Sequence, residues 1–159
     1  MKSLMTPLRS LCVTLLVGLL LASCSKSPPP PTLAAITFTA DEKVNVDARS
    51  RSTPVVVRYY LLKNDSAFNT TDFFSLLDKD QQTLGDAIVL REEFTLKPGE
   101  TKKIDTKDAG PAQTLAVFVQ YRNIDRAMWR SAMPLTLHKT NDVSVSLKND
   151  QITLAGKSR

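Results

Sequence analysis

From Leu33 onward the sequence is divided into short runs of β-branched and aromatic residues, and turn-forming residues interrupt these runs at short intervals. Runs of roughly four to eight such residues between Gly, Pro, Asn or Asp are typical of β-strands. The clearest runs lie at residues 33–40, 55–62, 93–96, 101–105, 115–121, 130–137, 143–147 and 152–154. About eight strands with frequent turns predict a mainly β chain, for which an antiparallel two-sheet β-sandwich is the simplest architecture.

The connection between the first two runs, residues 41–53, is long and polar. Connections between strands are usually much shorter, so a long one is either functional or simply flexible. Later in the chain, residues 115–121 are apolar on both alternating faces, which predicts a central strand covered on both sides. The last residues, 155–159, are expected to be frayed.

The apolar spacing changes from strand-like to helix-like between residues 66 and 78. Five large side chains there follow one helical stripe: Phe68, Phe73, Phe74, Leu76 and Leu77. We therefore expect a small helical insertion near residues 66–78. These aromatic residues are expected to close one side of the core, and a binding groove is the alternative interpretation.

The N-terminal residues have the pattern of a bacterial lipoprotein signal peptide. Lys2 and Arg9 give the start a positive charge, and residues 11–22 form an apolar run too short to span a bilayer comfortably. Leu21-Ala22-Ser23-Cys24 then has the spacing that a lipoprotein signal peptidase reads. We expect residues 1–23 to be removed and Cys24 to be acylated.

The alternative is cleavage by the ordinary signal peptidase, which would leave Cys24 as a spare thiol. Ser25 follows the cysteine, whereas an Asp there usually retains enterobacterial lipoproteins at the inner membrane. The expected location is therefore the periplasmic face of the outer membrane, where the acyl chains hold the protein.

Residues 24–32 are expected to form a tether between this anchor and a single β-sandwich domain, residues 33–159. Four consecutive prolines, residues 28–31, favour an extended polyproline II spacer. Cys12 leaves with the signal peptide and Cys24 is acylated, so no disulfide is expected. The hydrophobic core must then stabilise the fold unaided.

The sequence contains no recognisable catalytic or metal-binding set. His138 is the only histidine and no thiolate is expected to be free, so there is no credible zinc site. Glu92 and Glu93 are adjacent in an expected strand and point to opposite faces, which excludes them as an acid/base pair. The basic residues are scattered, although the formal net charge is +5. We expect no enzyme activity, cofactor, metal, small-molecule substrate or nucleic-acid partner.

Three segments resemble, in order, the TssJ family of type VI secretion outer-membrane lipoproteins (SciN/VasD-like). Residues 45–62 resemble its Asn-Pro-Asp-x-x-Gly-Arg-Pro-x-Pro-Val-x-Val-Arg-x-Tyr-x-Leu stretch, with Val46, Ser50 and Ser52 in place of Pro, Gly and Pro. Residues 96–100 (Leu-Lys-Pro-Gly-Glu) recur in the family, and residues 121–130 resemble its Tyr-Arg-Asp-x-x-x-Ala-x-Trp-Arg segment.

The resemblance implies a transthyretin-like β-sandwich with a structural role. Members of the family anchor a trans-envelope complex to the outer membrane by binding the periplasmic C-terminal domain of TssM, within the TssJ-TssL-TssM membrane complex. The loop between the first two strands makes that contact, and here it corresponds to residues 41–53. A generic periplasmic-facing lipoprotein that binds another envelope protein or a small ligand is the alternative function.

We predict that the contact residues lie in this loop, among Asn45, Val46, Asp47, Arg49 and Arg51. The alternative is that the two polar residues, Asn45 and Asp47, only brace the turn, while the arginines are solvated. Five residues of the later segment are assigned to the integrity of the fold instead: Tyr121, Arg122, Asp125, Trp129 and Arg130.

Overall fold

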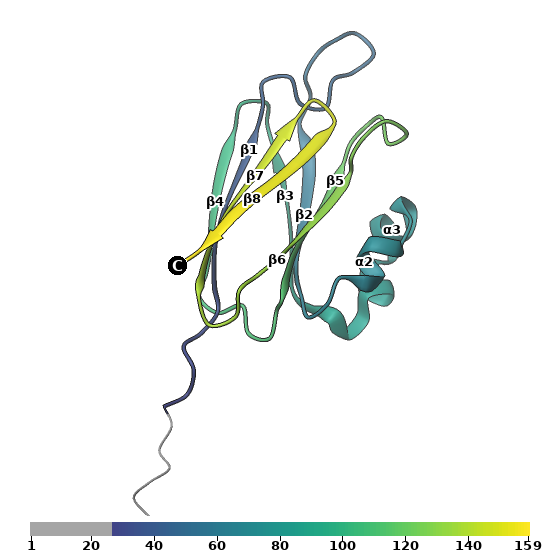
Figure 1. The fold of residues 1–159 in the computed structure, drawn as a ribbon. Helices are drawn as coiled ribbons and strands as arrows, with labels where there is room; N and C mark the ends of the chain where they lie inside the picture. Colours follow the sequence, from purple (N-terminus) through teal and green to yellow (C-terminus); the bar gives the residue numbers. More distant parts are fainter. Residues whose placement is uncertain (1–26) are drawn as a thin grey trace, which may run out of the picture.

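A computed structural model describes residues 27–159, which form a two-sheet β-sandwich with helices on one outer face (Figure 1). The predicted signal peptide, residues 1–23, and the predicted acylation site, Cys24, lie outside the described residues. One sheet contains, in spatial order, β4 (Thr101–Thr106), β1 (Leu33–Ala40), β7 (Thr140–Lys148) and β8 (Gln151–Ser158). The other contains β3 (Ile88–Leu96), β2 (Val55–Leu62), β5 (Thr114–Gln120) and β6 (Arg130–Pro134).

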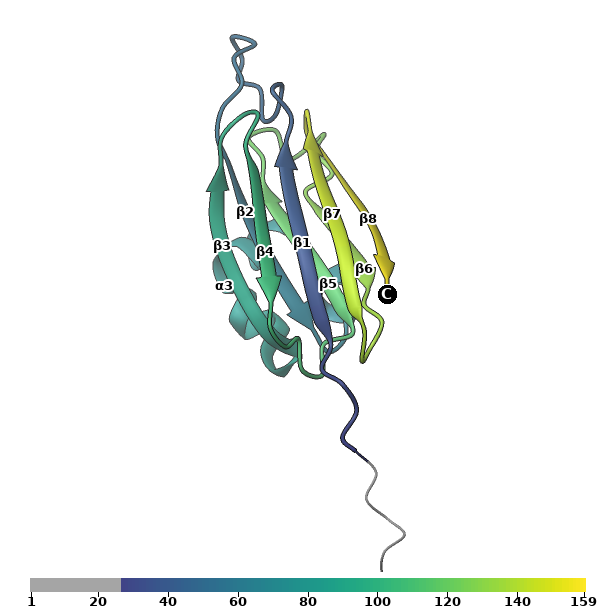
Figure 2. The same cartoon turned by 90° about the vertical axis from the view of Figure 1, so that its left-hand side faces the viewer.

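The predicted two-sheet β-sandwich is confirmed, with one parallel pair of strands as a difference. β1 pairs in parallel with β7, so that Ile36 lies opposite Val143, whereas the other paired strands of residues 27–159 are antiparallel. Figure 2 shows β1 between β4 and β7. Strands distant in the chain thus form the middle of this sheet.

The main hydrophobic core lies between the two sheets. Phe38 of β1, Tyr59 of β2 and Val117 of β5 are completely buried there. The Phe38 ring centroid lies 5.6 Å from that of Tyr59 and 5.1 Å from that of Phe94. Full burial of a side chain of this size contributes about 1.5–3 kcal/mol to stability, so this layer holds the sheets together without a covalent link.

A second hydrophobic cluster lies between the outer face of the β2–β5 sheet and two helices, α2 (Ser66–Thr70) and α3 (Phe73–Leu84). Tyr60, Phe68 and Phe118 are fully buried in it. Alternate residues of β5 enter the two clusters, as predicted for a central strand covered on both sides. Phe68 and Phe73 therefore close a side of the core as predicted, whereas the prediction is wrong for Phe74, which is 60% exposed.

The helical segment extends further than the sequence indicated. α3 continues past Asp78 to Leu84 and is followed by the 3-10 turn η1 (Gly85–Ala87), although Lys79 has non-helical dihedral angles (φ −134°, ψ 26°). Leu84 is 5% exposed and packs into the second cluster. Its burial explains why the chain resumes a helical path after the kink.

The expectation that residues 155–159 are frayed is wrong. β8 runs to Ser158 and pairs with β7 from Gln151 opposite Lys148 to Ser158 opposite Asn141. Arg159 Nε then donates to Asp142 Oδ2 at 2.7 Å. The partner strand, which is close in sequence, satisfies the backbone of a segment whose own residues give a weak strand signal.

The long first connection and residues 27–32, which belong to the predicted tether, lie at opposite ends of the sandwich (Figures 1 and 2). We call the end that carries residues 41–54, 121–129 and 149–150 the loop end. We call the other end, from which residues 27–32 depart, the tether end. This separation follows from the chain direction, because β1 runs from one end to the other.

Candidate functional site

The connection between β1 and β2 projects beyond the sheets at the loop end, but its base belongs to the folded core (Figure 1). The side chain of Val44 is completely buried in the main cluster. The Val44 N–H donates to the Asp41 carbonyl at 3.1 Å, and the Val44 carbonyl accepts from the Thr53 N–H at 3.4 Å. The two stems of the loop are therefore joined below its tip.

Asn45 forms four hydrogen bonds that hold the base of the loop in place. Its side chain donates through Nδ2 to the Pro54 carbonyl at 2.8 Å and accepts through Oδ1 from the Arg122 N–H at 2.9 Å. Its backbone N–H donates to the Asn149 carbonyl at 3.1 Å, and its carbonyl accepts from Thr53 Oγ1 at 2.6 Å. Asn45 is only 3% exposed. Its φ of 49° is left-handed, a conformation that Asn tolerates better than most residues.

The tip of the loop is a compact turn built on Asp47. Its Oδ1 accepts from the N–H groups of Arg49 and Arg51, both at 2.9 Å. Its Oδ2 accepts from Arg51 Nε at 3.0 Å and Nη2 at 2.8 Å. The bonds from the Arg51 backbone and side chain hold the pKa of the Asp47 carboxyl below its usual value. Both oxygens of the Asp47 carboxylate therefore accept hydrogen bonds within the turn.

Three tip residues leave their side chains accessible to a partner. Val46 is 36% exposed, the Arg51 side chain is 67% exposed, and Arg49 is also exposed. Because Asp47 organises the backbone between them, these side chains are presented from a fixed frame. An ordered loop loses less conformational entropy on binding than a flexible one does.

A second loop, residues 121–129, lies against the first. Arg122 Nε donates to Thr53 Oγ1 at 3.2 Å, and the Met128 N–H donates to the Asp150 carbonyl at 2.9 Å. Met128 is 49% exposed. Residues from both loops line an open hollow: Val46, Asp47, Ala48, Arg122 and Asn123. The loop end therefore presents one surface made of two chain segments.

The exposed charge of this surface is mainly basic. Four arginines are exposed there: Arg49, Arg51, Arg122 and Arg126. Asp125 and Glu42 are also exposed nearby, whereas Asp47 is paired with Arg51. A surface of arginines with two exposed apolar side chains, Val46 and Met128, suits a partner that offers carboxylates around an apolar patch.

The five predicted contact residues have two structural roles. Asn45 and Asp47 brace the loop through their hydrogen bonds, as the alternative interpretation had it, and Asn45 is buried as well. Val46, Arg49 and Arg51 are the members available for contact, although Arg51 also ties the turn. Binding through any of them remains a prediction.

Arg122 and Met128 were not predicted as parts of this surface. We assigned Arg122 from the sequence to the integrity of the fold, and its guanidinium donates to Thr53 of the first loop. The sequence signal for these two residues was the resemblance of residues 121–130 to the same family. Only the strand topology shows that this segment lies beside the first loop. Tyr121, by contrast, is 3% exposed and donates to the Gln151 carbonyl at 3.1 Å, in line with its assigned structural role.

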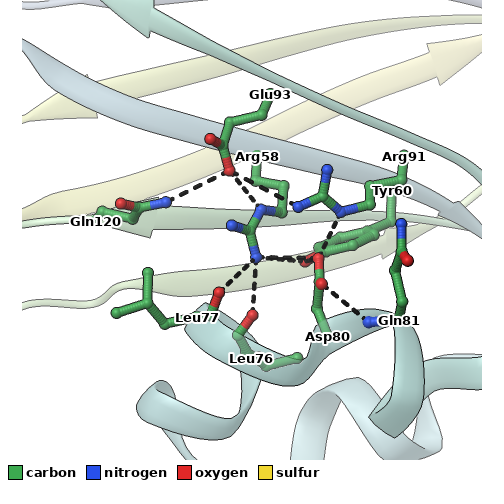
Figure 3. Close-up of polar contacts among 9 residues, drawn as sticks. All are labelled: Arg58, Tyr60, Leu76, Leu77, Asp80, Gln81, Arg91, Glu93 and Gln120. Atoms are coloured by element: carbon green, nitrogen blue, oxygen red, sulfur yellow. Dashed lines mark hydrogen bonds and ion pairs between the residues drawn. The ribbon is translucent and has the colours of Figure 1, made fainter.

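A cluster of charged side chains, centred on the buried Arg58 and Asp80, holds α3 on the sheet (Figure 3). Arg58 of β2 donates through Nη1 to Asp80 Oδ2 at 2.9 Å and to the Leu76 carbonyl at 2.8 Å. Arg91 Nε and the Tyr60 hydroxyl donate to the same Asp80 oxygen at 2.6 and 2.8 Å. Arg58 Nε reaches Glu93 at 2.6 Å. Every charge has an opposite partner, which is the pattern of a structural clamp.

Burial by itself would raise the pKa of the Asp80 carboxyl. The hydrogen bonds from Arg91 and Tyr60 and the charge of Arg58 outweigh this effect, so the pKa lies below its usual value.

Within residues 27–159 no group of three or more His, Cys, Asp or Glu side chains could hold a metal ion. Nor does any helix in that range have the length and apolarity to cross a membrane.

Fold and site together define a β-sandwich whose candidate site is a protruding two-loop interaction surface. The chain belongs to the type VI secretion lipoprotein family: residues 32–150 match the family model described as "Type VI secretion lipoprotein, VasD, EvfM, TssJ, VC_A0113". The resemblance found in the sequence is therefore confirmed. A comparison with curated proteins found no match.

Solved structures agree with this family. The lipoprotein TssJ1 of Pseudomonas aeruginosa is 33% identical with a TM-score of 0.77, and the match covers 80% of this chain and 98% of that one. Serratia marcescens Lip, described as a membrane-bound component of the type VI secretion system, is 28% identical with a TM-score of 0.73 and the same coverages.

A further match is to a chain of a structure described as the T6SS protein TssM C-terminal domain from EAEC. It is 22% identical with a TM-score of 0.66, and the match covers 77% of this chain and 99% of that one. At this identity the match shows the fold alone.

Proposed function

We propose that this chain is the outer-membrane lipoprotein of a type VI secretion membrane complex. In this proposal residues 1–23 are a signal peptide, and Cys24 is acylated and inserted in the periplasmic face of the outer membrane. The domain anchors the complex by binding the periplasmic C-terminal domain of TssM, which TssL accompanies. The role is structural, without catalysis.

The observation that carries the proposal is the position of the braced 41–54 loop at the end opposite the tether (Figure 1). A domain held at its tether end presents this loop away from the membrane, toward the periplasm. The hydrogen bonds of Asn45 and Asp47 keep the loop in one conformation. The family membership supports the secretion role, and the resemblance of residues 45–62 to the family's loop segment supports the choice of TssM as partner.

Arginines and exposed apolar side chains on two loops would supply the contact. Val46 and Met128 offer apolar area, and Arg49, Arg51 and Arg122 offer donors for partner carboxylates. Arginine is among the residue types that often carry much of the binding energy of an interface, and loops on a rigid scaffold are a usual place for binding residues.

The test is calorimetric titration of the domain, residues 25–159, with the periplasmic C-terminal domain of its cognate TssM. This fragment is expected to fold, because both hydrophobic clusters lie within it. The test variant is V46D/R49E, which changes exposed tip residues and leaves Val44 and Asn45 in place. We expect saturable binding of the unchanged domain and a loss of affinity of at least about tenfold in the variant, which corresponds to about 1.4 kcal/mol.

A matched control is K107E/K139E, which reverses two exposed charges at the tether end. Its affinity is expected to stay within about twofold of the unchanged domain, or about 0.4 kcal/mol. Equal losses in both variants would indicate a general charge effect and reject the loop as the contact. No binding by the folded, unchanged domain would reject TssM as the partner.

A further inference from the structure

The tether is part of the folded domain over its last residues. The Thr32 carbonyl accepts from the Ala109 N–H at 2.7 Å, and Thr32 Oγ1 accepts from the His138 N–H at 2.9 Å. His138 Nδ1 lies 2.9 Å from the Pro30 carbonyl, an arrangement in which the ring nitrogen donates. Thr32 is 2% exposed. Pro30 and Thr32, which the sequence assigned to the tether, are therefore bound to the domain.

Five residues, 25–29, separate Cys24 from the held Pro30. At roughly 3.1 Å per residue, an extended polyproline II segment of this length spans about 16 Å. β7, with nine residues, is about 30 Å long at roughly 3.3 Å per residue. A lipid attached at Cys24 therefore keeps the tether end of the domain, rather than its loop end, beside the headgroups.

The side chains around the tether suit a lipid surface. Leu137 is 40% exposed in the turn after β6, directly before His138. Lys139 and Lys107 are exposed on the two connections that hold Thr32. Two acids lie close to Lys107: Asp108, whose carboxylate accepts from the Gly110 N–H at 2.7 Å, and Asp105, which is exposed near the end of β4. An exposed leucine between lysines combines apolar and electrostatic attraction to an anionic membrane.

The position of Leu137 is determined by the fold. His138 has a φ of 61°, which few residues other than glycine adopt, and its N–H and ring are both bound to the tether. Asn141 Nδ2 donates to the carbonyls of Leu33 and Thr136 at 3.1 and 3.0 Å, which ties the same turn to the start of β1. Tether and turn therefore move as one body, with Leu137 beside the attachment point.

We propose that the tether end is a membrane-contact surface, in which Leu137 enters the headgroup layer and Lys107 and Lys139 bind lipid phosphates. This inference rests on the proposed lipid anchor at Cys24. It adds a second, protein-borne contact that sets the orientation of the domain and directs the loop end away from the bilayer.

The test places an environment-sensitive NBD fluorophore on L137C or, as the matched control, on V46C at the loop end. Each domain, residues 25–159, carries a hexahistidine segment in place of Cys24. Nickel-chelating lipid then holds it on vesicles of phosphatidylethanolamine and phosphatidylglycerol, so the geometry is tested independently of acylation. We expect doxyl-labelled lipid to quench the fluorophore at position 137 at least twofold more than at position 46.

The charge requirement is tested by adding K107E/K139E to L137C. Quenching at position 137 is expected to fall at least twofold in this variant and in high salt. Equal quenching at positions 137 and 46, or quenching unchanged by charge reversal, would overturn this inference and leave the proposed function intact. An unacylated Cys24 in the mature chain, seen by mass spectrometry, would overturn the anchor and this inference together. Loss of TssM binding alone would overturn only the proposed function.

Discussion

Asn45 Oδ1 accepts a hydrogen bond of 2.9 Å from the backbone N–H of Arg122, which lies 77 positions further along the chain. The same side chain donates to the Pro54 carbonyl at 2.8 Å. One buried amide thus joins the first connection to the loop after β5. The surface proposed to bind a partner therefore depends on a residue that the partner does not need to touch.

Replacement of Asn45 by Ala is expected to lower the free energy of unfolding by about 2–4 kcal/mol. The Pro54 carbonyl and the Arg122 N–H each lose a partner, and Ala at positive φ adds about 1 kcal/mol of strain. Urea unfolding measures the change. Asn45→Gly removes the same hydrogen bonds without the strain, so it should be about 1 kcal/mol more stable than Asn45→Ala. A fully stable Asn45→Ala variant would contradict this account.

The order of the loop tip is expected to depend on pH through Asp47. Its folded pKa lies below the ordinary 3.8, because the carboxylate accepts hydrogen bonds from the Arg51 backbone and side chain. A lowered pKa contributes stability that is fully present above 3.8 and is lost as the pH falls through the lower folded value.

Amide NMR shifts of Arg49 and Arg51 should report this titration, with a midpoint below 3.8. Asp47→Asn is the control, since it has no carboxyl to titrate and should remove the transition from both amides. A midpoint at or above 3.8 would show that these hydrogen bonds do not favour the ionised carboxylate in solution.

Replacement of Asp80 by Asn is expected to cost about 3 kcal/mol of stability. The side chains of Arg58 and Asp80 are only 6% and 8% exposed, so the variant removes the buried counter-ion of Arg58 and leaves only the partly exposed Glu93. Thermal or urea unfolding measures the loss, and amide exchange should show α3 opening first. Glu93→Gln is the control: because Glu93 is 37% exposed, its loss should cost only about 1 kcal/mol. Similar losses in both variants would reject the assignment of Asp80 as the centre of the clamp.

Replacement of Arg122 by Ala is expected to separate folding from binding. The variant keeps the backbone N–H that Asn45 accepts from and removes only an exposed side chain bonded to Thr53. We expect a stability change within about 0.5 kcal/mol and an affinity for the TssM domain reduced about fivefold, or about 1 kcal/mol. Unchanged affinity, measured by calorimetry, would restrict the contact surface to the first loop.

The sequence predicted which loop forms the candidate site, but it predicted only some of the residues on the surface of that site. The length and polarity of residues 41–53 identified the loop, and the resemblance of residues 45–62 predicts the partner-binding role that we propose for it. Sequence alone could not separate bracing residues from exposed ones, because the burial of Asn45 depends on Arg122 and Asn149. Arg122 and Met128 join the surface only because β1 and β5 both end at the loop end.

The sequence by itself determined the elements: runs of β-branched and aromatic residues define β1, β2 and β5, and the helical spacing of apolar residues between Phe68 and Leu77 defines the insertion, since these patterns are local. The tertiary structure decided which strands meet. The parallel pairing of β1 with β7, the ordering of residues 155–158 on β7 and the clamp of Arg58 on Asp80 all join groups through space. Such contacts form because burying apolar surface and pairing polar groups favour one arrangement of the whole chain, a preference that no local pattern records.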